Sequence, residues 1–153
     1  MSERVKTIQK FAAVSFDRLV EFTGSLTTEQ LDWKSVPEAN TIRWILTHLA
    51  EELSLYVPSF VPTLARPTDW PKDYTGNTSY TLQKIVEDID TGKKRVLEAL
   101  GKLTDKQLDE EVDMWGTKAK RDYAITMMLS EILHHEGQIA AILGLQKRMQ
   151  SAA

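Results

Sequence analysis

All five prolines of this chain lie in one stretch, between Pro37 and Pro71. Proline has no backbone N–H and its ring clashes with the preceding turn, so it breaks the interior of a helix. The chain before Pro37 and the chain after Pro71 are therefore free of the strongest helix breaker. No stretch alternates apolar and polar residues strongly enough to predict a strand. The sequence therefore predicts an all-α fold.

Apolar residues recur at spacings of three and four in four separate segments, which is the period of an amphipathic helix. The predicted helices span residues 3–23, 41–57, 79–100 and 122–149. Asn40 and Asp122 are the expected N-caps of the second and fourth helices, and Pro58 is expected to end the second. Four such helices in a chain of 153 residues predict a single domain, residues 1–153, folded as a four-helix bundle.

The connections between the predicted helices are long, where bundle loops usually have roughly 2–8 residues. Such connections often cross the bundle, so a simple up-down-up-down order is not required. The second connection, residues 58–78, carries Phe60, Trp70 and Tyr74 beside four of the prolines. Because it is so aromatic, we expect it to pack across one end of the bundle.

The composition excludes several classes of protein. The chain has no cysteine, which rules out disulfide scaffolds, zinc ribbons, iron–sulfur clusters and a cysteine nucleophile. A net charge of −3 argues against nucleic acid as a partner, since such binders normally carry a basic excess. Residues 1–11 lack the apolar core of a signal peptide, and the longest uncharged run, residues 53–65, is too short to span a bilayer. We therefore expect a cytoplasmic protein with no membrane partner.

Polar residues interrupt the apolar face of the second predicted helix. On a helical wheel His48 lies at the edge of that face and Glu52 lies well inside it. The two residues are four positions apart, so their side chains are neighbours. Trp44 lies one turn before His48 on the same side of the helix.

The fourth predicted helix shows the same anomaly. His135 lies at the centre of its inward face, with Glu131 one turn earlier and Gln138 one turn later, whereas His134 points toward the border. His48 and His135 both lie near the middle of their helices, so they fall at the same depth of a bundle. Two imidazoles and a carboxylate form the ligand set of non-haem iron sites and of some catalytic zinc sites. The alternative is a buried hydrogen-bond network in which His135 pairs with Glu131 or Glu52.

Two segments resemble the signatures of a known family. Residues 40–50, Asn-Thr-Ile-Arg-Trp-Ile-Leu-Thr-His-Leu-Ala, are similar to the first signature of the DinB-like (DinB/YfiT) superfamily of metalloenzymes, in which a Trp precedes the first metal-binding His by four residues. Residues 134–139, His-His-Glu-Gly-Gln-Ile, are similar to its second signature. Chain length, helix layout and long connections also fit, so the resemblance covers the whole chain.

The resemblance implies a metal site and a fold. His48 and His135 match two of the family's three ligands, and the third position, usually His, is occupied here by Glu131. It therefore implies a site made by His48, Glu131 and His135, holding zinc, nickel or iron. It also implies an up-down-down-up bundle, frequent homodimers, and activities that include thiol-dependent S-transfer and an isomerisation.

Two classes of function follow. As an enzyme, the protein would activate a low-molecular-weight thiol or water at the metal, for transfer to or hydrolysis of a small molecule. Gln138 would then support the metal ligands, or simply join two helices, and Glu52 would be a base or a fourth ligand. Alternatively, the chain is a non-catalytic, stress-related metal-binding bundle, or a partner-binding dimer without metal. A homodimer is expected because the outward side of the fourth helix has small and apolar residues, Ser130, Leu133, Gly137, Ala140 and Gly144, unless the third connection covers them.

Overall fold

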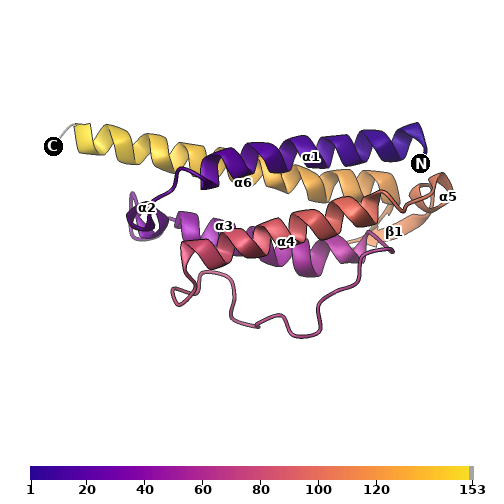
Figure 1. Cartoon of the computed structure of the whole chain (residues 1–153), viewed down its shortest axis with the longest axis horizontal. Coiled ribbons are helices and arrows are strands. Elements are labelled where there is room, and N and C mark those ends of the chain that lie inside the picture. Colours follow the sequence, from indigo (N-terminus) through magenta and orange to yellow (C-terminus); the bar gives the residue numbers. More distant parts are fainter. Residues whose placement is uncertain (152–153) are drawn as a thin grey trace.

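The computed structural model describes residues 1–151, and this part of the chain is mainly helical (Figure 1). Its six α-helices are α1 (Glu3–Thr23), α2 (Thr28–Asp32), α3 (Ile42–Glu51), α4 (Leu82–Leu100), α5 (Asp105–Leu108) and α6 (Arg121–Ser151). A π-helical turn, η1 (Glu52–Tyr56), and a 3-10 turn, η2 (Val57–Ser59), continue α3. The prediction of four long helices is confirmed. The last two residues of the predicted domain lie outside the described residues.

The four long helices lie side by side and share one core (Figure 1). α1 packs against α6 and α4, and α3 packs against α4 and α6. Each helix contributes fully buried apolar side chains, among them Phe16, Leu19, Ile45, Leu46, Leu49, Ile85, Leu100, Ile125 and Leu129. Burial of these side chains supplies the main favourable free energy of folding. None of the described helices is both long and apolar enough to cross a membrane.

Two of the predicted helix caps were wrong. Thr41, not Asn40, caps α3, because the Thr41 side chain accepts a hydrogen bond from the backbone N–H of Trp44. Asp122 lies within the first turn of α6 rather than before it, and its carboxylate forms an ion pair with Arg4 of α1. The Thr41 hydroxyl and the Asp122 carboxylate each stabilise a helix N-terminus, since either kind of oxygen can satisfy free backbone N–H groups there.

The prediction that the chain has no strand was also wrong. β1 (Glu111–Met114) and β2 (Thr117–Lys120) form an antiparallel hairpin between α5 and α6, with Val112 opposite Ala119. The turn residues Trp115 and Gly116 both have positive φ, of 53° and 85°, as a type I′ hairpin turn requires. The strands are too short for a clear alternation, and Trp-Gly is not the Asn-Gly or Asp-Gly pair that usually signals this turn.

The connection between α3 and α4 runs along the molecule and not across one end as predicted. Figure 1 shows that the helical segment formed by α3, η1 and η2 ends at the far end from the start of α4, so the chain must return along the molecule. On its way Thr63 donates a hydrogen bond to the carbonyl of Ala99, near the end of α4, over 2.7 Å. Further along, the Tyr74 hydroxyl donates to Asp88, two turns from the start of α4. The aromatic connection therefore forms a side wall against α4.

A buried guanidinium group joins three parts of the chain. Arg43 of α3 donates to both carboxylate oxygens of Asp32 in α2, over 2.6 and 2.7 Å, and to the carbonyl of Tyr80. The hydrogen bonds to Arg43 lower the pKa of Asp32, and those to Asp32 raise the pKa of Arg43. Since Arg43 is only 5% exposed, these partners compensate the cost of burying its positive charge.

We expect Asp32→Asn to lower the free energy of unfolding at neutral pH by about 1–2 kcal/mol, because it removes a charged acceptor from Arg43 while Asp32 itself is half-exposed. The folded-state pKa of Asp32 lies below its unfolded value of about 3.9. The stabilisation is therefore complete above that value and is lost as the pH falls through the folded pKa. Urea unfolding between neutral and acidic pH measures the difference. Glu29→Gln, at an exposed carboxylate of the same short helix, is the control, and an equal effect of both would contradict the assignment.

Candidate metal centre

Three side chains with metal-ligating atoms converge inside the molecule. His48 comes from α3, Glu52 from the first position of η1, and His135 from the middle of α6. One ligand atom from each lies within 4.8 Å of the other two. Nε2 of His48 is 3.5 Å from Oε1 of Glu52, and Nε2 of His135 is 3.4 Å from Oε2 of Glu52. These are the donor types that divalent transition metals prefer.

The local fold places the three residues opposite one another. His48 and Glu52 are one helical turn apart and therefore share a face of the α3–η1 segment. That segment packs against α6, which presents His135 from the facing side. The change from α-helical to π-helical hydrogen bonding begins at Glu52, and such turns are frequent at functional sites.

Two atoms of this group lack a hydrogen-bond partner. Oε2 of Glu52 and Nε2 of His135 are buried, and neither is hydrogen-bonded within the described residues. An unpaired buried polar atom costs about 1–3 kcal/mol, and more when it is charged, so native proteins rarely leave one. A cation bound by both atoms would remove this cost. The donor set and the two unpartnered atoms therefore fit a metal ion at this position.

A neighbouring amide sets the orientation of the His135 ring. Nδ1 of His135 lies 2.9 Å from Oε1 of Gln138, and Nε2 of Gln138 lies 3.0 Å from Nε2 of His134. An amide oxygen only accepts, so Nδ1 of His135 carries the hydrogen and donates it to Gln138. The lone pair of Nε2 then faces Glu52. Metal-binding histidines are usually held through their second ring nitrogen in this way.

The surroundings of His135 favour a positive charge at this point. Burial by itself would lower the pKa of His135, but the contacts with Glu52 and Gln138, together with the charges of Glu52 and Glu131, raise it above its ordinary value. A proton on Nε2 is thus the alternative to a metal ion between His135 and Glu52. Metal and proton would compete for the same lone pair.

Glu131, the third ligand that the resemblance implies, does not join His48 and His135, whereas Glu52 does. Glu131 is partly exposed and stays outside the group of three, although it is close enough to affect the pKa of His135. Glu52, which the sequence suggested as a base or fourth ligand, is the carboxylate in the group. A helical wheel puts Glu131 on the same face as His135, but it does not tell which carboxylate lies across from the imidazole.

An aromatic ring and a glycine support His48 from outside the group. The Trp44 ring stacks on His48 with centroids 4.9 Å apart and an angle of 24°. Gly76 in the long connection has φ +76°, and a Cβ atom there would lie 2.9 Å from Cδ1 of Trp44. Its N–H donates to the Thr47 hydroxyl over 2.8 Å. Sequence reasoning missed Gly76, for which the only signal is a Gly-Asn turn pair in the connection.

The three candidate ligands are not equally exposed. The side chain of His48 is 28% exposed, whereas those of Glu52 and His135 are 12% and 6% exposed. The group is therefore buried on the side of α6 and open to solvent beside His48.

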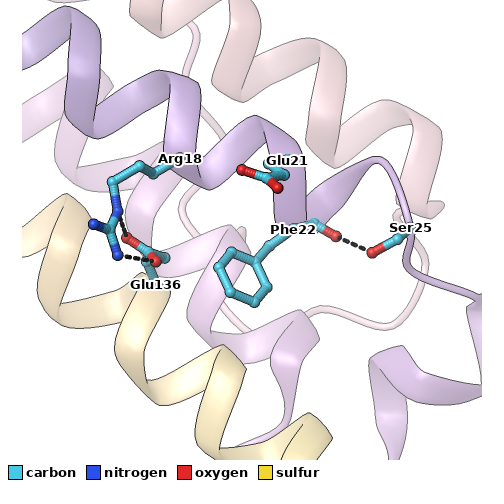
Figure 2. Close-up of a pocket in the computed structure, with 5 residues that line it drawn as sticks. All are labelled: Arg18, Glu21, Phe22, Ser25 and Glu136. Carbon is cyan, nitrogen blue, oxygen red and sulfur yellow. Dashed lines mark hydrogen bonds and ion pairs between the residues drawn. The ribbon is translucent and has the colours of Figure 1, made fainter.

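A separate pocket of about 610 Å³ lies between α1 and α6 (Figure 2). There Arg18 of α1 donates two hydrogen bonds of 2.8 Å to the buried carboxylate of Glu136, the residue after His135. These bonds lower the pKa of Glu136 and raise that of Arg18. The pocket has no imidazole, and Glu136 is engaged by Arg18, so this pair fixes α6 against α1 and is no metal site.

Comparison with known proteins found one matching family model and several solved structures with the same fold. Residues 13–139 match a family model described as DinB superfamily. Solved structures with the same fold include a DinB-like protein from Bacillus subtilis, with 16% identity, a TM-score of 0.70 and 92% of each chain covered. A DinB-like protein from Bacillus cereus has 16% identity and a TM-score of 0.69, with 87% of this chain and 86% of that chain covered. A conserved protein from Enterococcus faecalis has 15% identity and a TM-score of 0.68, with 93% and 96% covered. No curated protein matches the chain.

Proposed function

Because this chain belongs to the DinB superfamily, we propose that it is a metal-dependent enzyme that activates a low-molecular-weight thiol, or water, for reaction with a small molecule. One zinc, nickel or iron ion would be held by His48, Glu52 and His135. The observation that carries the proposal is the buried, unpartnered pair formed by Nε2 of His135 and Oε2 of Glu52. Glu52 thus replaces Glu131 in the ligand set that the resemblance implies.

The arrangement of the long helices supports an up-down-down-up bundle as the topology of this site. In Figure 1 α1 and α6 run in one direction, and α3 and α4 run in the other. The neighbours α3 and α6 are then antiparallel, and His48 and His135 meet where these two helices pack against each other.

The metal ion and the side chains would contribute different parts of the chemistry. A bound divalent metal ion lowers the pKa of a thiol or water and so favours the nucleophilic, deprotonated form. The chain orients the donors, because Gln138 holds Nδ1 of His135 and Trp44 stacks on His48. The partial exposure of His48 leaves a path for a small electrophile.

The proposal predicts a metal-dependent transfer reaction. With 2-mercaptoethanol and 1-chloro-2,4-dinitrobenzene, the thiol sulfur forms a bond to the ring carbon, chloride leaves, and the thiol proton passes to buffer. We expect the rate above background to follow the metal content and to disappear with a chelator. Gln138→Leu should weaken metal binding by about 10–100-fold, as loss of such a supporting hydrogen bond usually does.

Gln83→Leu, at an exposed position of α4, is the matched control and should leave metal binding and rate unchanged. A fully metal-loaded protein that accelerates neither thiol transfer nor ester hydrolysis would favour the alternative, a non-catalytic metal-binding protein. Absence of bound metal in protein purified without chelator or His tag, even after metal is added back, would contradict both.

We further propose that the protein forms a homodimer through the outer side of α6. Gly137 is exposed, and a Cβ atom added there would meet nothing within 4 Å. The other four residues of the predicted patch, Ser130, Leu133, Ala140 and Gly144, are half-buried, and Met127 and Leu145 of the same helix are exposed. Small and apolar residues of this kind allow another surface to approach closely.

Gly137→Arg should therefore convert the dimer to a monomer while leaving the fold intact, because the side chain has free space in the monomer. Light scattering over a range of concentrations measures the mass. Gln83→Arg on α4 is the control and should remain dimeric. A wild-type protein that is monomeric at all accessible concentrations would exclude this interface.

A further inference from the structure

A separate pocket of about 340 Å³ lies between the long connection and α4. Its walls are Trp70, Tyr74 and Tyr80 on one side and residues of α4 on the other. None of the three candidate metal ligands lines it. The volume is at the lower end of the range for small-molecule sites, so it suits a ligand of one or two fused rings.

The three aromatic side chains form a continuous wall. The ring centroids of Trp70 and Tyr74 are 4.6 Å apart, and those of Tyr74 and Tyr80 are 4.5 Å apart. Tyr74 is only 2% exposed, and its hydroxyl is fixed by the hydrogen bond to Asp88. Pro67 and Pro71 restrict the backbone beside Trp70. The wall is therefore formed before any ligand binds.

Two side chains at this pocket, Trp70 and Arg95, have hydrogen-bond donors without partners in the described part of the chain. Nε1 of Trp70 is buried and has no hydrogen-bond partner within residues 1–151, and an indole nitrogen can only donate. Arg95 uses one guanidinium N–H to reach the carbonyl of Ala65, which leaves other donors for a ligand. Asp88, by contrast, already accepts from Tyr74 and Lys84. The pocket thus offers donors from Trp70 and Arg95. The partly buried carboxylate of Asp88 is compensated by Lys84 and Tyr74, and Asp69, which also lines the pocket, is exposed to solvent.

We propose that this pocket binds a small planar aromatic carboxylate. The ring system stacks on the wall of Trp70, Tyr74 and Tyr80. The carboxylate accepts hydrogen bonds from Nε1 of Trp70 and from the guanidinium group of Arg95. This arrangement gives the buried indole N–H the acceptor that the chain itself does not provide.

The probe is 2-naphthoate, titrated by calorimetry into the full-length, metal-loaded protein. We expect Trp70→Phe, which keeps an aromatic ring but removes the N–H, to weaken binding about tenfold or more, since a hydrogen bond to a charged carboxylate is lost. Arg95→Gln should weaken it by about tenfold or more, since a charged hydrogen bond is lost. Lys94→Gln removes the same charge from the exposed neighbour of Arg95 and should change nothing.

Two further measurements separate this pocket from other sites. A carboxylate could also bind the proposed metal, so the His48→Ala, His135→Ala double variant should retain its affinity for 2-naphthoate. Loss of binding in that variant would place the carboxylate at the metal and overturn the proposal. Neutral 2-naphthol should bind at least about tenfold more weakly than 2-naphthoate. Equal binding of the two, or no effect of Trp70→Phe and Arg95→Gln, would also overturn it.

Discussion

Replacing both His48 and His135 with Ala should reduce metal affinity by at least about 100-fold, since even the loss of a supporting partner of a ligand costs about 10–100-fold. The double variant removes two of the three donors that lie within 4.8 Å of one another. Elemental analysis and competition with a chromogenic chelator measure the content and the affinity. Metal that remains at the wild-type level would exclude this group of residues as the site.

The same measurements of metal affinity distinguish the role of Glu52 from that of Glu131. Glu52→Gln and Glu131→Gln each replace a carboxylate by an amide of the same shape, so they form a matched pair. We expect Glu52→Gln to weaken metal binding strongly and Glu131→Gln to have a small effect, because only Glu52 lies opposite His135. The reverse order would restore the ligand set of His48, Glu131 and His135 that the resemblance implies. Equal, small effects would leave the two histidines as the main ligands.

Metal affinity should also fall on acidification, because an imidazole must be neutral to bind a metal. The contacts of His135 raise its pKa, so the loss should begin at a higher pH than an ordinary histidine would give. Chelator competition at several pH values measures this dependence. In Glu52→Gln the pH at which metal affinity falls should move toward that of an ordinary histidine, since the main partner that favours the imidazolium is gone.

The second large effect is expected from Gly76→Ala. An L-residue at φ +76° costs about 1–2 kcal/mol, and the new methyl group would lie 2.9 Å from the Trp44 ring, which adds about 1–3 kcal/mol of overpacking. The free energy of unfolding should therefore fall by about 2–5 kcal/mol. Because Trp44 stacks on His48, metal affinity should fall as well.

Gly116→Ala provides a control for the backbone contribution. Gly116 has a similar φ of +85°, but a Cβ atom there would meet nothing within 4 Å. Its cost should be about 1–2 kcal/mol, with no change in metal affinity. Urea unfolding and chelator competition on both variants isolate the contact with Trp44. If the two variants lose equal stability and both retain metal, Gly76 has no role in positioning His48.

Much of the fold could be predicted because helix formation depends on nearby residues. The period of apolar positions indicated four long helices, and for α1 it gave the same bounds as the structure, Glu3–Thr23. The same wheels placed His48, Glu52 and His135 on inward faces, since residues one turn apart necessarily share a face. Local sequence was less informative for the hairpin of β1 and β2, where two strands of four residues pair only because the turn brings them together.

The tertiary structure decided which of the inward polar groups meet. Glu52 and Glu131 were equivalent on their wheels, but only the packing of α3 against α6 places Glu52 opposite His135. Gly76 is distant from Trp44 in the sequence, so its contact follows from the path of the long connection along α4. A helical wheel specifies the direction of a side chain about the axis of the helix that carries it. The distance to a side chain on another helix depends on where and how deeply the two helices cross, which non-local packing determines.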